Sequence, residues 1–333
     1  MADHPGDTGS PSLPLGPGAS GPAVADLQRR LAALGFTPEL DGVFAQRTIS
    51  AVESFQSLRG LVATGSCDGA TWSAVVEAGF GLGDRVLYLA RPMLRGDDVA
   101  DLQRRLGGLG FDAGRIDGIL GPDTDTALRE FQRHSGLRPD GVCGPATLAQ
   151  LARLGPRISS PAAVAGVRER ERLRDTPRHL HERRILVAHA GGLDAIATAL
   201  ARTLSATGAL ATVVQHRDPS AIASEANALD AEVVVDLEIG PGPCWCAFYR
   251  SGDFESAGGR RLAELLTAEL ASAGFEVAEP RGMRLPTLRE TRMPAVVTHL
   301  GPPTSAVTGA GAITAACATG LTTWIREPLS PQD

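Results

Sequence analysis

The chain has 333 residues, of which 43% are hydrophobic, and a formal net charge of −6 at pH 7. This length and apolar content allow two or three domains, each with a core of its own. Mild acidity and the lack of a long basic run argue against nucleic acid as a partner. No stretch approaches the ~20 apolar residues that span a bilayer, so we expect no membrane span.

The first residues are rich in glycine, proline and serine, and no charged start is followed by an apolar segment. This composition predicts a disordered tail at residues 1–17 and argues against a secretory signal. Two of the five cysteines, Cys67 and Cys143, stand just before helical stretches at equivalent places of a repeat, which favours small buried side chains over a disulfide. We therefore expect a reduced, cytoplasmic protein, with association with the cell wall as the alternative.

An eight-residue sequence, VADLQRRL, begins at Val24 and occurs again at Val99. An identity of this length predicts a tandem pair of one small module, which we place at residues 18–80 and 92–155. Within the second copy, apolar residues recur at helical spacing, Gly-Pro pairs stand at helix starts, and Asp-Gly pairs form turns. Each module is therefore expected to contain three short helices.

The chain changes character after the second module. Residues 156–183 contain a mixed-charge run, Arg168 to Arg172, which predicts a solvated helix or linker. From Arg184 on, apolar runs at 185–187, 213–214, 233–235 and 295–297 alternate with helical stretches at 193–206, 219–229, 259–273 and 309–325. This alternation predicts an α/β domain at 184–327, with a mostly parallel sheet flanked by helices, and a tail at 328–333. The expected fold class is multidomain, with two all-α modules before the α/β domain.

The second module carries turn and helix residues in a fixed order. They are Asp98-Val99, Leu102-Gln103, Leu106, Asp117-Gly118, Gly121, Thr124, Ala127-Leu128, Phe131-Gln132, Asp140-Gly141, Gly144 and Thr147. This pattern resembles the peptidoglycan-binding-like module, and the first copy departs from it at 45–47 and 65–66. The Asp-Gly pairs are turn residues by their own chemistry. The resemblance implies a ligand site in the second copy, at Asp117, Gly118, Phe131, Gln132, Asp140, Gly141 and Thr147.

The α/β half carries shorter pieces in a consistent order. They are 184–187 leading into Gly191-Gly192, His216-Arg217, Ala226-Asn227, 232–239, Phe248-Tyr249, Ser256, Leu262-Ala263 and 288–296. In order and spacing these pieces resemble the zinc-dependent N-acetylmuramoyl-L-alanine amidase domain of the amidase-3 type. Tandem modules before such a domain resemble the actinobacterial amidase-like cell-wall regulators, in which the metal ligands are degenerate.

The resemblance implies a zinc site of two histidines and one glutamate, with a second glutamate as general base. All of these positions are changed here. Aligned on the glycines, Ala190 stands at the first histidine, and His189 lies one residue early, on the other side of an extended strand. The glutamate that opens the first helix has no counterpart, although Asp194 is nearby. Glu238 stands at the second histidine, and His299 stands at the catalytic glutamate.

Three functions are compatible with these changes, of which the third is a purely structural scaffold whose repeats bind another protein. In the first, the metal site and the chemistry are lost, no cofactor is expected, and the chain is a peptidoglycan-binding or precursor-binding regulator or scaffold in cell-wall synthesis. In the second, a rewired zinc site of His189, Asp194, Glu238 and His299 makes the chain an active amidase that hydrolyses the bond between N-acetylmuramic acid and L-alanine. The expected partners are peptidoglycan fragments, lipid-linked or nucleotide precursors, and a cell-wall synthesis enzyme.

Overall fold

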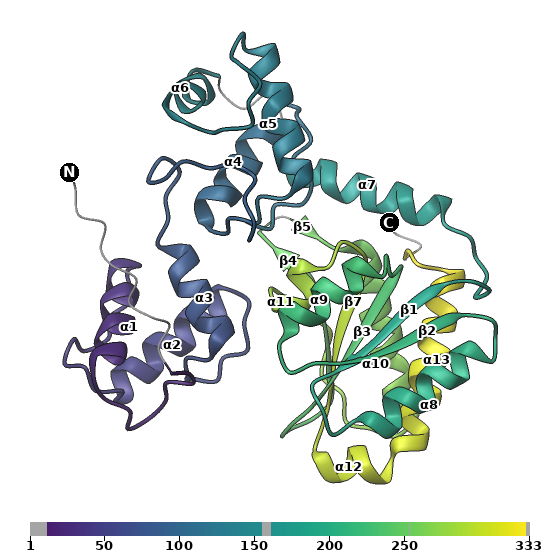
Figure 1. The fold of residues 1–333 in the computed structure, drawn as a ribbon. Helices are drawn as coiled ribbons and strands as arrows, with labels where there is room; N and C mark the ends of the chain where they lie inside the picture. Colours follow the sequence, from purple (N-terminus) through teal and green to yellow (C-terminus); the bar gives the residue numbers. More distant parts are fainter. Residues whose placement is uncertain (1–11, 155–160, 253, 331–333) are drawn as a thin grey trace. The chain divides into compact units, whose positions relative to one another are not determined.

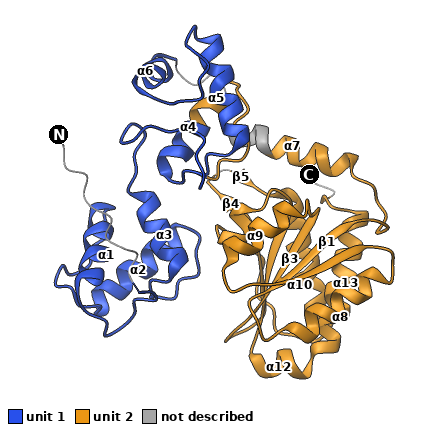
Figure 2. Cartoon of the chain, in the orientation of Figure 1, with its two compact units in different colours: residues 1–103, 118–154 blue, residues 104–117, 155–333 orange. Residues whose placement is uncertain are grey.

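The computed structural model describes residues 12–154, 161–252 and 254–330. They form two compact units, of which the first comprises Met1–Gln103 and Gly118–Leu154 and the second Arg104–Asp117 and Gly155–Asp333 (Figure 1, Figure 2). Parts of the predicted tails (1–11 and 331–333) and of the predicted linker (156–160) lie outside the described residues. None of the helices in the described part of the chain combines the length and apolar character needed to cross a membrane.

The two predicted modules each contain three helices, as expected. The first has α1 (Pro22–Ala33), α2 (Gln46–Leu58) and α3 (Gly69–Ala78), and the second has α4 (Asp97–Gly108), α5 (Pro122–His134) and α6 (Pro145–Arg153). Helices α1, α5 and α6 begin with proline directly after a glycine. Proline is favoured there because an N–H in the first helical turn has no carbonyl partner within the helix. Its absence in proline therefore costs no hydrogen bond. The Asp68 side chain caps α3 by accepting a hydrogen bond from the backbone of Thr71.

In each module a leucine ahead of the first helix pairs with the cysteine ahead of the third helix. Leu15 forms a backbone bridge with Cys67, and Leu87 forms the corresponding bridge with Cys143. Both leucines and both thiols are buried, which confirms the cysteines as small buried side chains. Because Leu15 belongs to the core of the first module, the prediction of a tail to residue 17 is wrong from Leu15 on. The second module likewise includes Leu87, ahead of its predicted start at 92.

The second unit is built on a mixed sheet that has seven strands among the described residues. They are β1 (Arg184–His189), β2 (Leu210–Gln215), β3 (Val233–Ile239), β4 (Trp245–Ser251), β5 (Phe254–Glu255), β6 (Arg281–Met283) and β7 (Ala295–Leu300). The order is β2-β1-β3-β7-β4-β5, with β6 beside β4. Strands β2, β1, β3 and β7 are parallel, as predicted, whereas β4 runs antiparallel to β7. The connection from β3 to β4 is too short for a parallel crossover, so the chain reverses there.

Helices cover both faces of this sheet. One face, which we call the α10 face, carries α8 (Asp194–Ser205), α10 (Ala257–Ser272) and α13 (Ala310–Arg326), the last reached from β7 through α12 (Pro303–Thr308). The other, the α9 face, carries α9 (Pro219–Ala228) and α11 (Pro286–Glu290) (Figure 1). Side chains alternate between the faces along each strand. Thus Val187 and Val235 lie in the α10-face core, and Leu186 and Val234 lie in the α9-face core.

Helix α7 (Pro161–Asp175) contains the mixed-charge run. The charged run 168–172 is helical and exposed or half-exposed, as predicted. The helix is also anchored to the domain, because Leu173 is buried in the α10-face core. The Glu169 carboxylate also accepts hydrogen bonds from Ser256 Oγ (2.5 Å) and from the backbone N–H of Gly258 (3.3 Å). Since these groups begin α10, the carboxylate also meets the positive end of that helix. Helix α7 is therefore a packed element of the second unit.

We expect Leu173→Ala to destabilise the attachment of α7 by about 2 kcal/mol, because it removes a buried leucine side chain. Hydrogen exchange measured by mass spectrometry should then show faster exchange in peptides covering residues 166–175. The matched control is Val167→Ala on the same helix, where the native side chain is 45% exposed. Equal protection of α7 in both variants would contradict the role given to Leu173.

Candidate functional site

Each module contains two copies of one hydrogen-bonded arrangement, which we call the glutamine clasp. In each clasp a buried glutamine NH2 donates to a threonine hydroxyl and to the carbonyl of the residue after a turn glycine, while the glycine N–H donates to the glutamine oxygen. The donor–acceptor distances lie between 2.8 and 3.2 Å. The clasps are Gln28, Gly42, Val43 and Thr48; Gln56, Gly65, Ser66 and Thr71; Gln103, Gly118, Ile119 and Thr124; and Gln132, Gly141, Val142 and Thr147. All four glycines have φ between 69° and 74°, where glycine is favoured.

The clasps change the interpretation of the ligand site predicted in the second module. Phe131, Gln132 and Thr147 are at most 4% exposed. Phe131 is a core residue, whereas Gln132 and Thr147 form the fourth clasp together with Gly141. A ligand cannot touch such side chains without unfolding the module, so the prediction is wrong for these three residues. Their place in the family pattern is explained by the fold.

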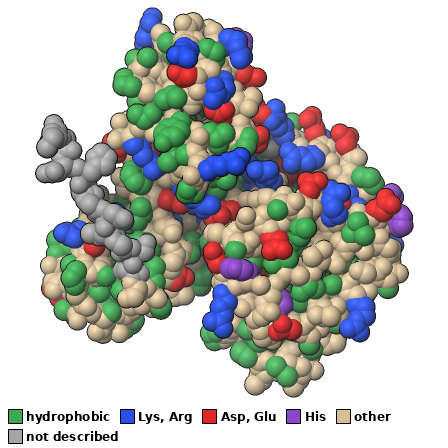
Figure 3. All heavy atoms as spheres, in the orientation of Figure 1, with side chains coloured by type: hydrophobic (Ala, Val, Ile, Leu, Met, Phe, Trp, Pro, Cys, Tyr) green, Lys and Arg blue, Asp and Glu red, His purple; other side chains and the backbone are tan. Residues whose placement is uncertain are grey.

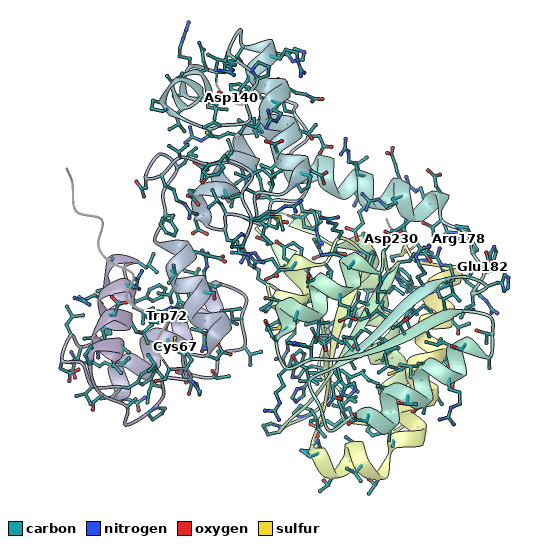
Figure 4. All side chains as sticks on the ribbon, viewed as in Figure 1. Cys67, Trp72, Asp140, Arg178, Glu182 and Asp230 are labelled. Carbon is teal, nitrogen blue, oxygen red and sulfur yellow. The ribbon has the colours of Figure 1, made fainter. Side chains whose placement is uncertain are left out.

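The remaining predicted residues of that site lie at the two Asp-Gly turns. Asp140, which Figure 4 labels, accepts hydrogen bonds from the backbone N–H of Val142 (3.0 Å) and from Gln132 (3.0 Å). The first of these bonds contributes most to a pKa of Asp140 below its ordinary value. Gly118 donates to the third clasp, and the backbone carbonyl of Asp117 accepts a hydrogen bond from Arg289 (2.7 Å). These residues thus have structural roles, and the two aspartates are the ones with exposed surface.

A surface cleft of about 410 Å³ lies in the first module. It is formed by the loop that follows α1 and by the exposed side of α2. The lining residues are Gly35, Phe36, Thr37, Gln46, Arg47, Ser50, Ala51 and Ser54. The Phe36 ring packs edge-to-face on the core ring of Phe55, with centroids 5.7 Å apart. The cleft therefore combines a fixed aromatic ring, several hydroxyls and one arginine, and no sequence motif predicted it.

In the second unit, polar side chains meet on the α9 face at the carboxyl ends of β3 and β7. Glu238 and His299 are neighbours in the parallel register, so they share this face. The His299 ring stacks on Trp245 at a centroid distance of 4.8 Å, and its Nε2 donates to the Pro241 carbonyl (3.1 Å). A Cβ at residue 240 would stand 2.6 Å from His299 Cε1, so Gly240 leaves room for the stacked ring.

Two carboxyl groups of β3, the buried Asp236 and the half-buried Glu238, lie at this strand end. Asp236 accepts a hydrogen bond from the Thr287 hydroxyl (2.8 Å). Burial raises the pKa of Asp236 to about 6. Burial, with a smaller contribution from the charge of Asp236, raises the pKa of Glu238 to about 7. Loss of hydration disfavours the charged form of both acids. Glu238 therefore keeps its proton over much of the range up to neutral pH.

His189 lies on the opposite side of the sheet. It is buried, its register partner is Leu237 of the α10-face core, and its Nε2 is 3.9 Å from an Asp194 carboxylate oxygen. This confirms the prediction that a one-residue offset turns His189 to the other face. The sheet thus separates His189 and Asp194 from Glu238 and His299, which share the α9 face.

These positions do not fit the zinc ion that the family resemblance implies. Zinc needs three or four ligand atoms about 2.0–2.3 Å from one point. The described residues contain no group of three or more histidine, cysteine, aspartate or glutamate side chains that could hold a metal. In addition, the hydrogen bond to Pro241 engages Nε2 of His299, which leaves only Nδ1 of this ring as a metal ligand.

Residues 112–117 of the second unit pack against the end of its sheet. The Arg115 guanidinium lies over the Tyr249 ring, 4.4 Å from its centroid, and donates to the Thr291 carbonyl (2.6 Å). Ile116 packs against the α9-face core, and its carbonyl accepts a hydrogen bond from the Tyr249 hydroxyl (3.4 Å). This segment follows Phe111, the counterpart of Phe36. In the second copy the loop after the first helix therefore packs against the sheet, whereas the same loop of the first copy lines the cleft.

Acidic and basic side chains are both visible on the surfaces in Figure 3.

Comparisons with known proteins find similar sequences for both halves of the chain. The family described as "Putative peptidoglycan binding domain" matches residues 20–75 and 95–151. The N-acetylmuramoyl-L-alanine amidase CwlM of Mycobacterium tuberculosis is 32% identical over 324 residues, covering 84% of this chain and 79% of CwlM. The amidase CwlL of Bacillus licheniformis is 33% identical over 160 residues, covering 41% and 44%. The catalytic domain of the amidase CwlV from Bacillus (Paenibacillus) polymyxa var. colistinus aligns with 43% of this chain and 98% of its own, at 18% identity and a TM-score of 0.36.

Proposed function

The chain belongs to the family of N-acetylmuramoyl-L-alanine amidase-like proteins with tandem peptidoglycan-binding domains, and from this premise we propose that it binds peptidoglycan or its precursors without hydrolysing them. The observation that carries the proposal is the separation of His189 from Glu238 and His299 by the sheet. The side chains that replace the family's zinc ligands therefore do not meet at one point. The α/β domain then acts as a binding platform for a cell-wall synthesis enzyme, and the chain is a regulator or scaffold.

The state of the remaining polar groups supports this proposal. A carboxyl group must lose its proton before it can bind a metal. The pKa of Glu238 is raised to about 7, so a large share of this side chain is neutral at neutral pH. The His299 ring is held between Trp245 and the backbone of Gly240. These contacts stabilise the fold of the strand end.

We further propose a cytoplasmic location, where lipid-linked and nucleotide precursors of the wall occur. The five cysteines support it, because all of them are free and buried. Free thiols are typical of reducing compartments. The alternative location, association with the mature wall, would expose the same modules to polymeric peptidoglycan.

Metal analysis and a wall-binding assay test the proposed function. After dialysis against zinc and then against metal-free buffer, we expect far less than one zinc per chain by mass spectrometry of the metal. We also expect the protein to co-sediment with purified cell wall and to release no peptide from it, with CwlL as the positive control for hydrolysis. His299→Ala should change none of these results.

Two outcomes would overturn the proposal. About one zinc per chain together with wall hydrolysis, both lost in His299→Ala, would establish the active amidase instead. Protein that stays in the supernatant with purified wall and gives no heat of binding with soluble wall fragments would show that the chain does not bind this class of ligand.

A further inference from the structure

We propose that the cleft of the first module is the ligand site of the tandem pair and that it binds the carboxylate of a muropeptide, a wall fragment in which a short peptide is attached to an amino sugar. This inference rests on the proposed function and names the ligand class and the module that takes it. It moves the site from the second copy, where the family pattern is more complete, to the first.

The cleft has the groups that such a ligand requires. Binding sites combine apolar surface with a few well-placed polar groups. Phe36 supplies a half-buried ring that Phe55 holds in place, with the two ring planes at 76°. Ser50 and Ser54 are exposed one helical turn apart on α2, so their hydroxyls lie on the same side of the cleft. Hydroxyls of this kind can pair with the amide and hydroxyl groups of a sugar and a peptide.

Arg47 is the cation of this cleft. Its side chain is 73% exposed, and its ion pair with Glu39 is long (3.5 Å) and also exposed. An exposed pair of this kind contributes little energy, because water competes for both charges. The guanidinium can therefore exchange Glu39 for a ligand carboxylate, which it can bind through two parallel hydrogen bonds.

The corresponding surface of the second module has the opposite charge. The register of the repeat places Asp123 at the position of Arg47, Glu130 at Ser54 and Asp112 at Thr37. The carboxylates of Asp123 and Glu130 would repel the carboxylate of a muropeptide. Asp112 is not counted with them, because it is ion-paired with Arg168 within the second unit. The two copies thus share a fold and differ in the surface that a ligand meets. Only the first copy offers a positive charge at this place to the negative carboxylate of the ligand.

Titration calorimetry of the full chain tests this inference with two soluble probes. Muramyl dipeptide has an amino sugar, a peptide and a free carboxylate, whereas chitotriose in its fully N-acetylated form is a neutral sugar without a peptide. We expect the chain to bind muramyl dipeptide at least tenfold more tightly than chitotriose, and Arg47→Glu to weaken muramyl dipeptide binding about tenfold or more. Because Arg47 is so exposed, this change should leave the thermal unfolding of the chain unaltered.

Asp123→Ala is the matched control at the equivalent position of the second copy and should keep the affinity of the unaltered chain. Unchanged affinity in Arg47→Glu would overturn the inference, and so would an equal loss in both variants. Equal binding of chitotriose would overturn the role of the carboxylate. If the chain binds cell wall but not muramyl dipeptide, the inference fails and the proposed function stands. If it binds neither, both fail.

Discussion

Replacing Gln132 with alanine is expected to lower the free energy of unfolding of the second module by about 3 kcal/mol, since a buried clasp loses all of its bonds at once. The Gln132 side chain is 1% exposed and holds Gly141, Val142 and Thr147. Without it, buried donors and acceptors remain unpaired, and each costs roughly 1–3 kcal/mol when water cannot replace the partner. A module with such a small core has little stability to spare.

Hydrogen exchange gives the local measurement for this prediction. Peptides covering residues 122–151 should exchange much faster in Gln132→Ala, while peptides from β1 and β3 should keep their protection. The matched control is Gln150→Ala on α6, where the native side chain is half-exposed. If the two variants exchange alike, the clasp does not hold the module together.

The second large effect concerns pH and Glu238. Its pKa is about 7 in the folded chain against an ordinary value of 4.5, so between these values the folded state keeps a proton that the unfolded state has released. The contribution to stability is therefore fully present below pH 4.5 and is lost as the pH rises through about 7. Asp236 acts in the same direction, with a pKa of about 6 against 3.8.

We expect the second unit to be more stable at pH 5 than at pH 8, by about 2 kcal/mol from Glu238 after allowance for its partial exposure. Glu238→Gln keeps the shape and removes the charge, so it should raise stability at pH 8 and flatten the pH profile measured by urea unfolding. Glu264→Gln on the surface of α10, where the native side chain is 40% exposed, is the control. A profile that stays as steep in Glu238→Gln as in the unaltered chain would contradict this assignment.

Local signals allowed much of the fold to be predicted from the sequence. The octamer and the spacing of Gly-Pro and Asp-Gly pairs placed all six helices of the modules, because their starts and turns depend on neighbouring residues. Apolar runs likewise placed β1, β2, β3 and β7. The direction of β4 was not predicted, since an apolar strand has the same pattern in either orientation. The packing of α7 depends on Leu173 and on the contacts of Glu169 with the start of α10, which a charge pattern conceals.

The candidate site was harder to predict because a residue of the family pattern can serve either the fold or a ligand. Gln132 and Thr147 resembled ligand residues by their place in a pattern, and their burial shows that they hold the turn. A usable signal was present in the sequence. In all four clasps the glycine and the threonine are separated by five residues, twice within each module. Arg47 and Phe36 gave no such signal, because the cleft depends on the distance between a loop and a helix.

The clasps also set the order in which the chain acquires structure. No clasp bond joins residues more than 21 positions apart, whereas the centre of the sheet pairs Val234 with Ala295. Contacts between near neighbours form quickly because closing a short loop costs little chain entropy. During synthesis the modules can therefore fold as soon as they leave the ribosome. The α/β domain has to wait until β7 has been made, so the chain carries a folded binding unit well before its second half is complete.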